Sequence, residues 1–451
     1  MQNKQSSSAS YPLLATMAVL GLTVVFVGGA RIAHSQKISK IEIEQGRDML
    51  RQVKSELVKT YYDPSFHGFD TEARFKQADE MIKKAQSNGQ VFGIIAQALL
   101  ELNDSHTIFF PPRRAARVEY GWQMKAVGDG CYVSAVKPGS DAEAKGLSVG
   151  DKVLSIDGRP LDRSKVWLAK YLYYTLRPQP GMSLVVEKPD GQEQQVVVQA
   201  KVREGKKILN FTGNDNGEDI WNEMREEQAE ARLHRHRFHE IGEDLVIWKM
   251  PQFDLMEEEV GDKAGKFRNR KALILDLRGN GGGYVKTLEW LAGYFFPQDI
   301  TIAELKGRKK MKPVTARGRG NQIFKGQLVV LVDGDSGSAA ELFARLVQLE
   351  KRGMVIGDRS AGAVMRSIYY PLQLGVDKVI PFGLSVTDAD VVMADGKSLE
   401  HSGVTPNELV LPSAADMANK RDPVLARAAA LVGVNLDPEK AGSLFPIEWR
   451  K

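Results

Sequence analysis

The chain has 451 residues, of which 43% are hydrophobic and 26% are charged, and this is the composition of a globular protein. The length is enough for roughly two to four domains with their own cores. The formal net charge of +5 is too small to indicate a nucleic-acid-binding protein, and the sequence has no dense basic face with interleaved aromatic residues. The single cysteine, Cys131, excludes an intrachain disulfide and a multi-cysteine metal site, and we expect neither a metal nor another cofactor.

The first 35 residues contain a long apolar segment. Residues 11–30 are mainly apolar and could span roughly 30 Å of hydrocarbon as a helix. Gly28 to Ala30 and Ala33 to Ser35 each resemble the small-x-small pattern of a signal-peptide cleavage site. Cations at positions 31, 37 and 40 follow the segment, and the positive-inside rule would keep that side in the cytoplasm. We interpret residues 1–35 as a signal peptide or a retained membrane anchor.

Residues 36–117 have a mainly helical pattern. Apolar residues between positions 49 and 58 recur at spacings that line one face of a helix, and further helical stretches are predicted at about 71–84 and 93–100. The region ends in a loop that holds Ser105 and His106 next to each other. A lone histidine in a loop is usually solvated. This pair has a catalytic role only if residues far away in the sequence lie next to it in the fold.

Residues 118–203 form a β-rich module. From Val133 to Gly158 the sequence predicts a strand, a Pro-Gly turn, a short helix that ends at Gly146, a second strand and an Asp-Gly turn. This order resembles a PDZ domain, a fold that binds an extended peptide as an added strand, often by its C-terminus. The resemblance implies a carboxylate-binding loop at Gly130, Cys131 and Tyr132. A PDZ fold that serves only as a spacer or gate is the alternative, and Cys131 fits a buried core residue better than a nucleophile.

Residues 204–243 form a charged insert with few apolar residues, which we interpret as a linker. His234, His236 and His239 lie within it and raise the question of a metal site. The histidines alternate with arginines, and no carboxylate within the run completes a known ligand spacing. We therefore predict a solvated segment without metal.

An alternation of strands and helices fills residues 244–412. Strands are predicted at 245–250, 272–277, 327–333 and 354–357, and the second is followed by a glycine-rich loop at 279–283. The loop is not a P-loop, because Val285 precedes Lys286 and Thr287, but its glycines could present bare N–H groups to a ligand. Residues 413–451 are expected to form a helical tail, with a helix that starts at Asp422-Pro423.

Ser338 is predicted at the N-terminus of a helix that follows the strand 327–333 and an Asp-Gly-Asp turn. Backbone N–H groups are unpaired there and the helix dipole is positive, so the position suits a nucleophile whose product is an oxyanion. However, Ser338 and Glu341 also form the pattern of a capping box, in which the serine only satisfies a backbone donor. This stretch alone leaves both interpretations open.

Three motifs occur in order behind the PDZ-like module: DLRGNGGG at 276–283, SGSAAELF at 336–343 and VIGDRSAG at 355–362. Together they resemble the C-terminal processing (tail-specific) peptidase and tricorn-core family of serine peptidases, over roughly 45–411 except the insert. The resemblance implies an α/β (α+β) fold with a helical N-terminal region, a PDZ domain and a peptidase core of the ClpP/crotonase-like type. It also implies a hydrolase that cleaves proteins or peptides, some of them engaged by their C-termini, on the exported side of the cell envelope.

The resemblance assigns roles to residues of this chain. Ser338 aligns with the nucleophile, and the N–H groups of one or both of Gly281 and Gly282, together with that of Ala339, align with the oxyanion hole. The PDZ-bearing members use a lysine base in a Gly-Lys pair, but here that pair is Gly362-Ala363.

The tricorn-like branch instead uses a Ser-His pair and a glutamate. Ser105, His106 and Glu400 match these positions, and we predict His106 as general base, Ser105 as its orienting residue and Glu400 as the charge behind Ser105. A histidine with an ordinary pKa of about 6.5 is mostly neutral at pH 7 and can accept a proton without a large shift.

Two other functions stay open at this stage. Ala363 is compatible with a non-catalytic PDZ scaffold that has a degenerate peptidase fold, and a Ser–Lys enzyme could borrow Lys351 or Lys378. The sequence also leaves open a homo-oligomer, the identity of the substrate, and contact with the membrane through residues 11–30.

Overall fold

The computed structural model describes residues 38–113, 116–204, 235–375 and 379–449. The apolar segment 11–30 and most of the charged insert lie outside the described residues, as do His234 and Lys378. Within the described ranges, no helix is both long and apolar enough to cross a membrane.

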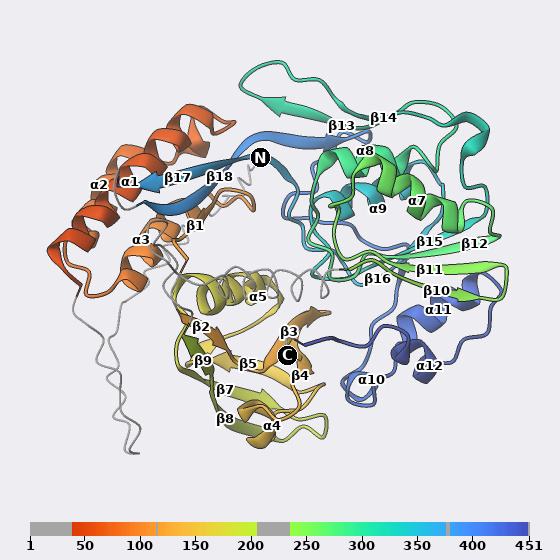
Figure 1. Ribbon diagram of the computed structural model, residues 1–451, viewed down its shortest axis with the longest axis horizontal. Helices are drawn as coiled ribbons and strands as arrows, with labels where there is room; N and C mark the ends of the chain where they lie inside the picture. The colour runs from red at the N-terminus through yellow and green to blue at the C-terminus, as the bar shows by residue number, and fades with distance from the viewer. Residues whose placement is uncertain (1–37, 114–115, 205–234, 376–378, 450–451) are drawn as a thin grey trace, which may run out of the picture. The chain divides into compact units, whose positions relative to one another are not determined.

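Three helices form the predicted N-terminal helical region: α1 (Lys40–Thr60), α2 (Thr71–Ile82) and α3 (Asn88–Leu100). Each follows a polar N-cap residue, Ser39, Asp70 or Ser87, whose side chain accepts a backbone N–H bond. The apolar stripe predicted for the first helix is buried at Met49, Leu50, Val53 and Leu57, while Val58 is exposed. The helix packs against two strands, β17 (Met365–Leu374) and β18 (Ile380–Met393) (Figure 1). A 3₁₀ turn, Phe66–Gly68, connects α1 and α2.

β17 and β18 belong to a five-stranded sheet with β1 (Ile108–Phe110), β13 (Ile300–Gly307) and β14 (Val314–Ala316). The long strand β18 pairs with β17, and it also pairs with β1 and β13 at successive stretches of its length. Since β1 starts two residues after His106, this pairing fixes the Ser-His loop to the C-terminal half of the chain.

A second sheet has the order β10–β11–β12–β15–β16–β19, in which every strand after β10 runs parallel to its neighbour. Its strands are Arg237–Ile241, Leu245–Lys249, Ala272–Asp276, Gln327–Val332, Met354–Gly357 and Glu408–Leu409. The sequence analysis assigned residues 204–243 to a linker, and this is wrong for β10. Its mixed pattern of charged and apolar residues hides an edge strand that pairs with β11 through five residue pairs.

Helices cover both faces of this parallel sheet (Figure 1). Val246, Trp248 and Leu275 point toward the core formed with α7 (Glu257–Phe267), α8 (Val285–Ala292) and α9 (Ala339–Leu349). Alternate residues pack against the C-terminal helices α11 (Pro423–Leu431) and α12 (Pro438–Ser443), which with α10 (Ala414–Ala418) form the predicted tail. Burial on both sides explains the continuous apolar runs of these strands.

The PDZ-like module has the sheet order β3–β4–β5–β7–β8, with β6 paired to β5. These strands are Trp122–Val127, Gly130–Val136, Lys152–Ile156, Gly181–Glu187, Glu193–Gln199 and Arg159–Pro160. β2 (Ala116–Glu119) and β9 (Lys201–Glu204) pair with each other where the chain enters and leaves the module. Its helical segments are α4 (Asp141–Ala144), η2 (Arg163–Lys165), α5 (Val166–Lys170) and η3 (Tyr171–Leu176). Outside this module, an exposed 3₁₀ turn, η4 (Gly320–Gln322), precedes β15.

Candidate active site

Ser338 lies where β15 leads into α9, at the carboxyl ends of the parallel strands. Its φ of +53° is a conformation that side chains other than glycine rarely adopt, and such strain is found mainly at functional sites. The Glu341 N–H donates to the Ser338 carbonyl oxygen at 2.9 Å, and the Glu341 carboxylate accepts from the Ser338 N–H at 3.0 Å. The glutamate half of the capping box is therefore formed, while the Ser338 hydroxyl is turned toward His106 instead of capping the helix.

Four residues from three distant parts of the sequence meet around this hydroxyl. The Nε2 atom of His106 lies 3.4 Å from the Oγ atom of Ser338, and its Nδ1 atom lies 2.7 Å from the Oγ atom of Ser105. The Ser105 hydroxyl donates to Oε2 of Glu400 at 2.9 Å, and the Ser105 N–H donates to Oε1 at 2.8 Å.

This hydrogen-bond pattern defines the histidine tautomer. A serine hydroxyl has one hydrogen, and that of Ser105 is directed at the Glu400 carboxylate. Ser105 must then accept the bond from His106, which places the proton of the neutral imidazole on Nδ1. The lone pair of Nε2 is left facing Ser338, as a general base requires.

Asp104 holds the loop that presents His106. Its carboxylate accepts from the N–H groups of His106 and Thr107 at 2.9 and 2.7 Å, from the Thr107 hydroxyl at 2.8 Å, and from the Thr387 hydroxyl of β18 at 2.7 Å. The sequence analysis did not single out this aspartate. An Asp two residues before a loop His is a recognisable Asx-turn signal, but the bond to Thr387 spans 283 residues and is visible only in the fold.

Glu341 is fully buried and organises the segment that would carry the lysine of the Ser–Lys enzymes. Besides the Ser338 N–H, its carboxylate accepts from the Ser360 hydroxyl at 2.5 Å and from the N–H groups of Gly362 and Ala363 at 2.8 and 3.0 Å. The Ala363 carbonyl in turn accepts from the Ser338 N–H at 2.9 Å. One carboxylate thus fixes the backbone of Ser338 and the neighbouring loop together.

The glycine loop approaches Ser338 closely but offers fewer free donors than the sequence suggests. A Cβ atom on Gly282, whose φ is +104°, would lie 2.6 Å from the Cβ atom of Ser338, so only glycine fits. The Gly282 N–H donates to the Oδ1 atom of its neighbour Asn280 at 2.8 Å and is not available to an oxyanion. Among the described residues, the N–H groups of Gly281 and Ala339 donate to no protein acceptor, which leaves these two as candidate oxyanion donors.

A buried ion network anchors the glycine loop to the helical tail. The Arg278 guanidinium makes paired hydrogen bonds to Asp276, at 2.9 and 2.8 Å, and to Asp422, at 2.9 and 2.7 Å. Lys249 donates to the Arg278 carbonyl at 2.6 Å. Asp422 is also the N-cap residue of α11, so the tail is tied directly to the backbone that precedes Gly281.

Removing the charge of Asp422 is expected to loosen this loop. Asp422→Asn can still cap α11, but it leaves the buried Arg278 with one carboxylate partner, and losing half of a buried pair costs roughly 3 kcal/mol of stability. We expect the kcat for peptide cleavage to fall about tenfold, because an oxyanion donor acts mainly in the transition state. Asp437→Asn, at the N-cap of α12, is the matched control. Equal kcat values for the two variants would contradict this positioning role.

Burial determines the protonation of the three titratable groups. It lowers the pKa of His106, against the opposing charge of Asp104, and so favours the neutral base. Burial raises the pKa of Glu400 although the Val364 N–H and the Ser105 hydroxyl and N–H donate to its carboxylate. Burial also raises the pKa of Glu341 to about 6, against the four hydrogen bonds that stabilise its charge.

Of the two lysines considered as alternative bases, Lys351 is not near Ser338. Lys351 follows the far end of α9, and eleven helical residues separate the two ends by about 16 Å. Lys378 lies outside the described residues. At the position of the usual lysine, Ala363 contributes only backbone groups.

The residues predicted as the PDZ carboxylate loop do not lie where a peptide can add. Gly130, Cys131 and Tyr132 belong to β4, which is flanked by β3 and β5, and the Cys131 side chain is fully buried. The predicted loop is therefore wrong, because a new strand needs an unpaired edge. In the order β3–β4–β5–β7–β8, the strands at the two ends are β3 and β8.

The turn between β3 and β4 instead contacts the peptidase core. The Gly128 N–H donates to Asp358 at 2.9 Å, and Arg163 of η2 donates to the Gly128 carbonyl and to Asp358, both at 2.8 Å. Asp358 begins the segment that leads to the contacts of Glu341 with Gly362 and Ala363. The module is thus in direct contact with the loop beside Ser338.

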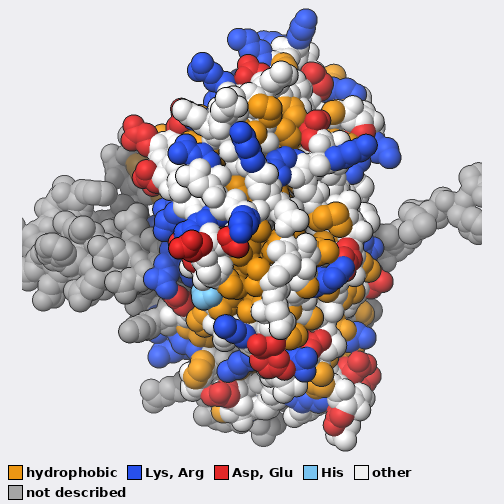
Figure 2. Space-filling model, turned by 90° about the vertical axis from the view of Figure 1, so that its right-hand side faces the viewer, with side chains coloured by type: hydrophobic (Ala, Val, Ile, Leu, Met, Phe, Trp, Pro, Cys, Tyr) orange, Lys and Arg blue, Asp and Glu red, His pale blue; other side chains and the backbone are white. Residues whose placement is uncertain are grey.

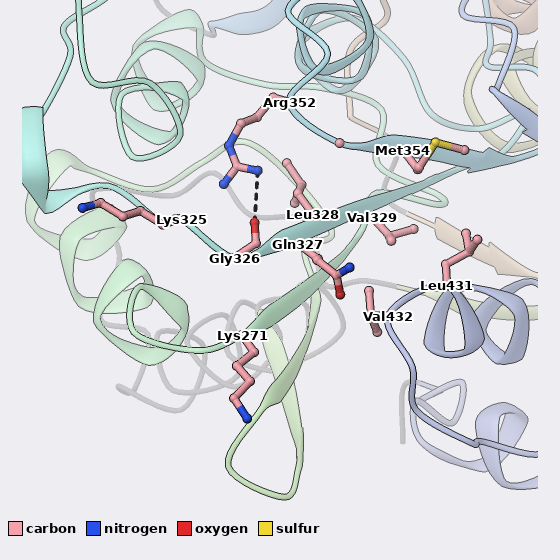
Figure 3. A pocket seen from close by; sticks show the side chains of 11 residues that line it. Lys271, Lys325, Gly326, Gln327, Leu328, Val329, Arg352, Met354, Leu431 and Val432 are labelled. Carbon is pink, nitrogen blue, oxygen red and sulfur yellow. Dashed lines mark hydrogen bonds between the residues drawn. The ribbon is translucent and has the colours of Figure 1, made fainter.

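A large hollow lined by described residues lies away from Ser338. This hollow, of about 630 Å³, lies at the amino ends of β12, β15 and β16. Arg352 donates to the Gly326 carbonyl there (Figure 3). Ser338 follows the opposite, carboxyl end of β15. On the face shown in Figure 2, hydrophobic side chains gather in the middle and cations and anions are interspersed around them, so the described residues there present no single-sign field.

The comparisons with known proteins concern the same regions. Residues 244–410 match the model of peptidase family S41, and residues 113–166 match that of the PDZ domain. The tail-specific protease of Haemophilus influenzae is 26% identical over 277 residues, which cover 57% of this chain and 36% of that protein. The chloroplastic carboxyl-terminal-processing peptidase 1 of Arabidopsis thaliana is 22% identical over 370 residues, 78% of this chain and 69% of that protein. The crystal structure of mature CPAF is similar in fold to this chain. Its TM-score is 0.61 at 15% identity, over 84% of this chain and 95% of CPAF.

Proposed function

We propose that this chain, a PDZ-containing serine peptidase of family S41, cleaves peptide bonds within protein or peptide substrates with Ser338 as nucleophile and His106 as general base. The observation that carries this proposal is the sequence of contacts from Ser338 through His106 and Ser105 to Glu400. These contacts support the roles found in any serine triad: nucleophile, base and carboxylate. Here the carboxylate of Glu400 contacts His106 indirectly, through the hydroxyl of Ser105.

In the proposed mechanism, Nε2 of His106 takes the hydroxyl proton of Ser338 as Oγ attacks the carbonyl carbon of the substrate. The imidazolium that forms keeps its Nδ1–H bond to Ser105, and the Glu400 carboxylate behind Ser105 stabilises the positive charge. The N–H groups of Gly281 and Ala339 donate to the tetrahedral oxyanion, where one such donor is worth about 3 kcal/mol. His106 then protonates the leaving amine, and a water molecule releases the acyl group from Ser338 by the same steps.

The alternative of a non-catalytic scaffold rested on Ala363. That argument loses its force because a histidine in the base form faces the serine from another part of the chain. For the PDZ domain, the contacts of Gly128 and Arg163 with Asp358 favour an influence on the site over a role as a mere spacer. We further propose that the chain acts on the exported side of the cell envelope, with residues 1–35 as signal or anchor, on the basis of its apolar segment 11–30.

Reaction with a fluorophosphonate probe tests the proposed nucleophile. We expect one probe molecule to attach to wild-type protein at Ser338, and none to attach to Ser338→Ala, because an unactivated serine does not react at a useful rate. Mass spectrometry of the labelled protein and its peptides gives both results. A wild-type protein that stays unlabelled while correctly folded would favour the scaffold.

The pH dependence of cleavage tests the proposed base. Protonated His106 cannot accept the proton of Ser338, so kcat/KM is expected to fall as the pH drops through the pKa of His106. Burial lowers this pKa, so the midpoint is expected below about 6.5. Initial rates between pH 4.5 and 8, with circular dichroism to verify folding, provide the measurement. A midpoint above pH 7 would argue against an uncharged, buried histidine as the base.

A further inference from the structure

Two aromatic side chains lie together on the surface although neither belongs to the proposed catalytic group. Phe110 of β1 and Tyr369 of β17 are 39% and 58% exposed, and their ring centroids are 5.7 Å apart at an interplanar angle of 66°. Exposed aromatic residues that touch each other, instead of standing alone, are typical of interaction sites.

The backbone between the two rings is shaped to hold them. Phe110 pairs with Gly383 of the intervening strand β18, and Tyr369 pairs with Ser385. A Cβ atom on Gly383 would lie 2.4 Å from the Tyr369 Oη atom and 2.8 Å from its ring. Glycine at this position therefore allows the Tyr369 ring to cross β18 and reach Phe110.

Phe110 lies in the strand that follows the loop holding the proposed base. Phe109 of β1 is 0% exposed and points into the core, so Phe110 takes the opposite face of this strand. At about 3.3 Å per residue, Phe110 is roughly 13 Å along the chain from His106. β17 also starts beside the site, directly after Val364, whose N–H donates to Glu400 at 2.7 Å.

We infer that Phe110 and Tyr369 form a substrate subsite that binds an apolar or aromatic side chain of an extended polypeptide, about four residues from the bond that is cleaved. The spacing follows because an extended substrate rises by the same distance per residue as β1. Aromatic faces accept aliphatic and aromatic side chains of many shapes, so this subsite would select unfolded apolar segments without requiring one sequence. The inference rests on the proposed peptidase function.

The test uses peptides that differ only in carrying Phe or Ala four residues from the cleaved bond, on either side of it. Wild-type protein is expected to prefer one Phe peptide by about tenfold in kcat/KM. Tyr369→Ala should reduce this preference to less than about twofold. Gly383→Ala should do the same, because its Cβ displaces the ring while Tyr369 is retained. Ile447→Ala removes an apolar side chain of similar exposure, 53%, and is the matched control.

A binding measurement separates this inference from the peptidase proposal. Fluorescence anisotropy of the same peptides with Ser338→Ala protein should show the Phe preference, and Ser338→Ala/Tyr369→Ala should lose it. If wild-type protein cleaves neither peptide but these binding results hold, the peptidase proposal fails and the subsite stands. If Gly383→Ala does not fold, Phe110→Ala replaces it. An equal Phe preference in wild-type protein and Tyr369→Ala, in cleavage and in binding, would overturn the subsite.

Discussion

Replacing His106 by alanine is expected to lower kcat for peptide cleavage by about four orders of magnitude, because it removes the side chain that, among the described residues, contacts the Ser338 hydroxyl as a proton acceptor. The variant leaves Ser105 and Glu400 in place, so substrate binding should change little and KM should stay close to the wild-type value. Steady-state kinetics on an unstructured peptide, with active-site titration to exclude wild-type contamination, give both constants. His67→Ala, at an exposed histidine on the η1 turn, is the matched control.

The contact between His106 and Ser105 can be tested by a double-mutant cycle. Ser105→Ala removes the acceptor that keeps the imidazole proton on Nδ1 and is expected to cost about a hundredfold in kcat. In the His106→Ala background the same change should cost almost nothing, because the interaction it disrupts is already absent. Additive losses would mean that Ser105 acts elsewhere. A His106→Ala enzyme with wild-type kcat would require a different base.

The proposed roles of Ser338, His106, Ser105 and Glu400 come from short motifs in a family resemblance, and the four side chains lie in contact in the structure. Their convergence could not be derived from the sequence alone, because the His106–Ser338 contact joins positions 232 residues apart. That contact depends on the pairing of β1 with β18 and on the position of α9 after a parallel strand. The parallel strands themselves were predictable, because burial on both faces demands unbroken apolar runs.

The errors share one physical cause, which is that pairing partners are not encoded in a local pattern. β10 resembles a solvated charged segment until β11 supplies its hydrogen bonds. The Gly130 to Tyr132 segment resembles a binding loop until β3 and β5 flank it. Gly282 differs from Gly281 as a donor only because the Asn280 side chain turns back to accept its N–H. Asp104 likewise acquires its role only when Thr387 lies beside it.

Glu341→Gln is expected to reduce kcat/KM by about a hundredfold, although the side chains of Ser338 and His106 are unchanged. The carboxylate accepts four hydrogen bonds on its two oxygens, and three of the donors are backbone N–H groups. A glutamine amide of the same size has one oxygen, so its NH₂ group must face at least two donors. Each unsatisfied buried donor costs about 1–3 kcal/mol, and relief of that cost requires the 360–363 loop to move away from Ser338. Glu350→Gln, at the exposed end of the same helix, is the control.

The stability difference between wild type and Glu341→Gln should depend on pH, because the carboxylate titrates and the amide does not. The pKa of Glu341 in the folded protein is about 6, above its ordinary value of 4.5, so the native state binds more protons than the unfolded state between these two values. Wild-type stability therefore loses about 2 kcal/mol from this group as the pH rises through that window, while the uncharged glutamine loses none. The stability deficit of Glu341→Gln relative to wild type is thus expected to be largest near pH 4.5 and to shrink by about 2 kcal/mol by pH 7. Urea unfolding at pH 4.5 and pH 7 measures the stability deficit. A deficit that grows with pH would show that the charged form of Glu341 stabilises the folded protein, which contradicts a raised pKa.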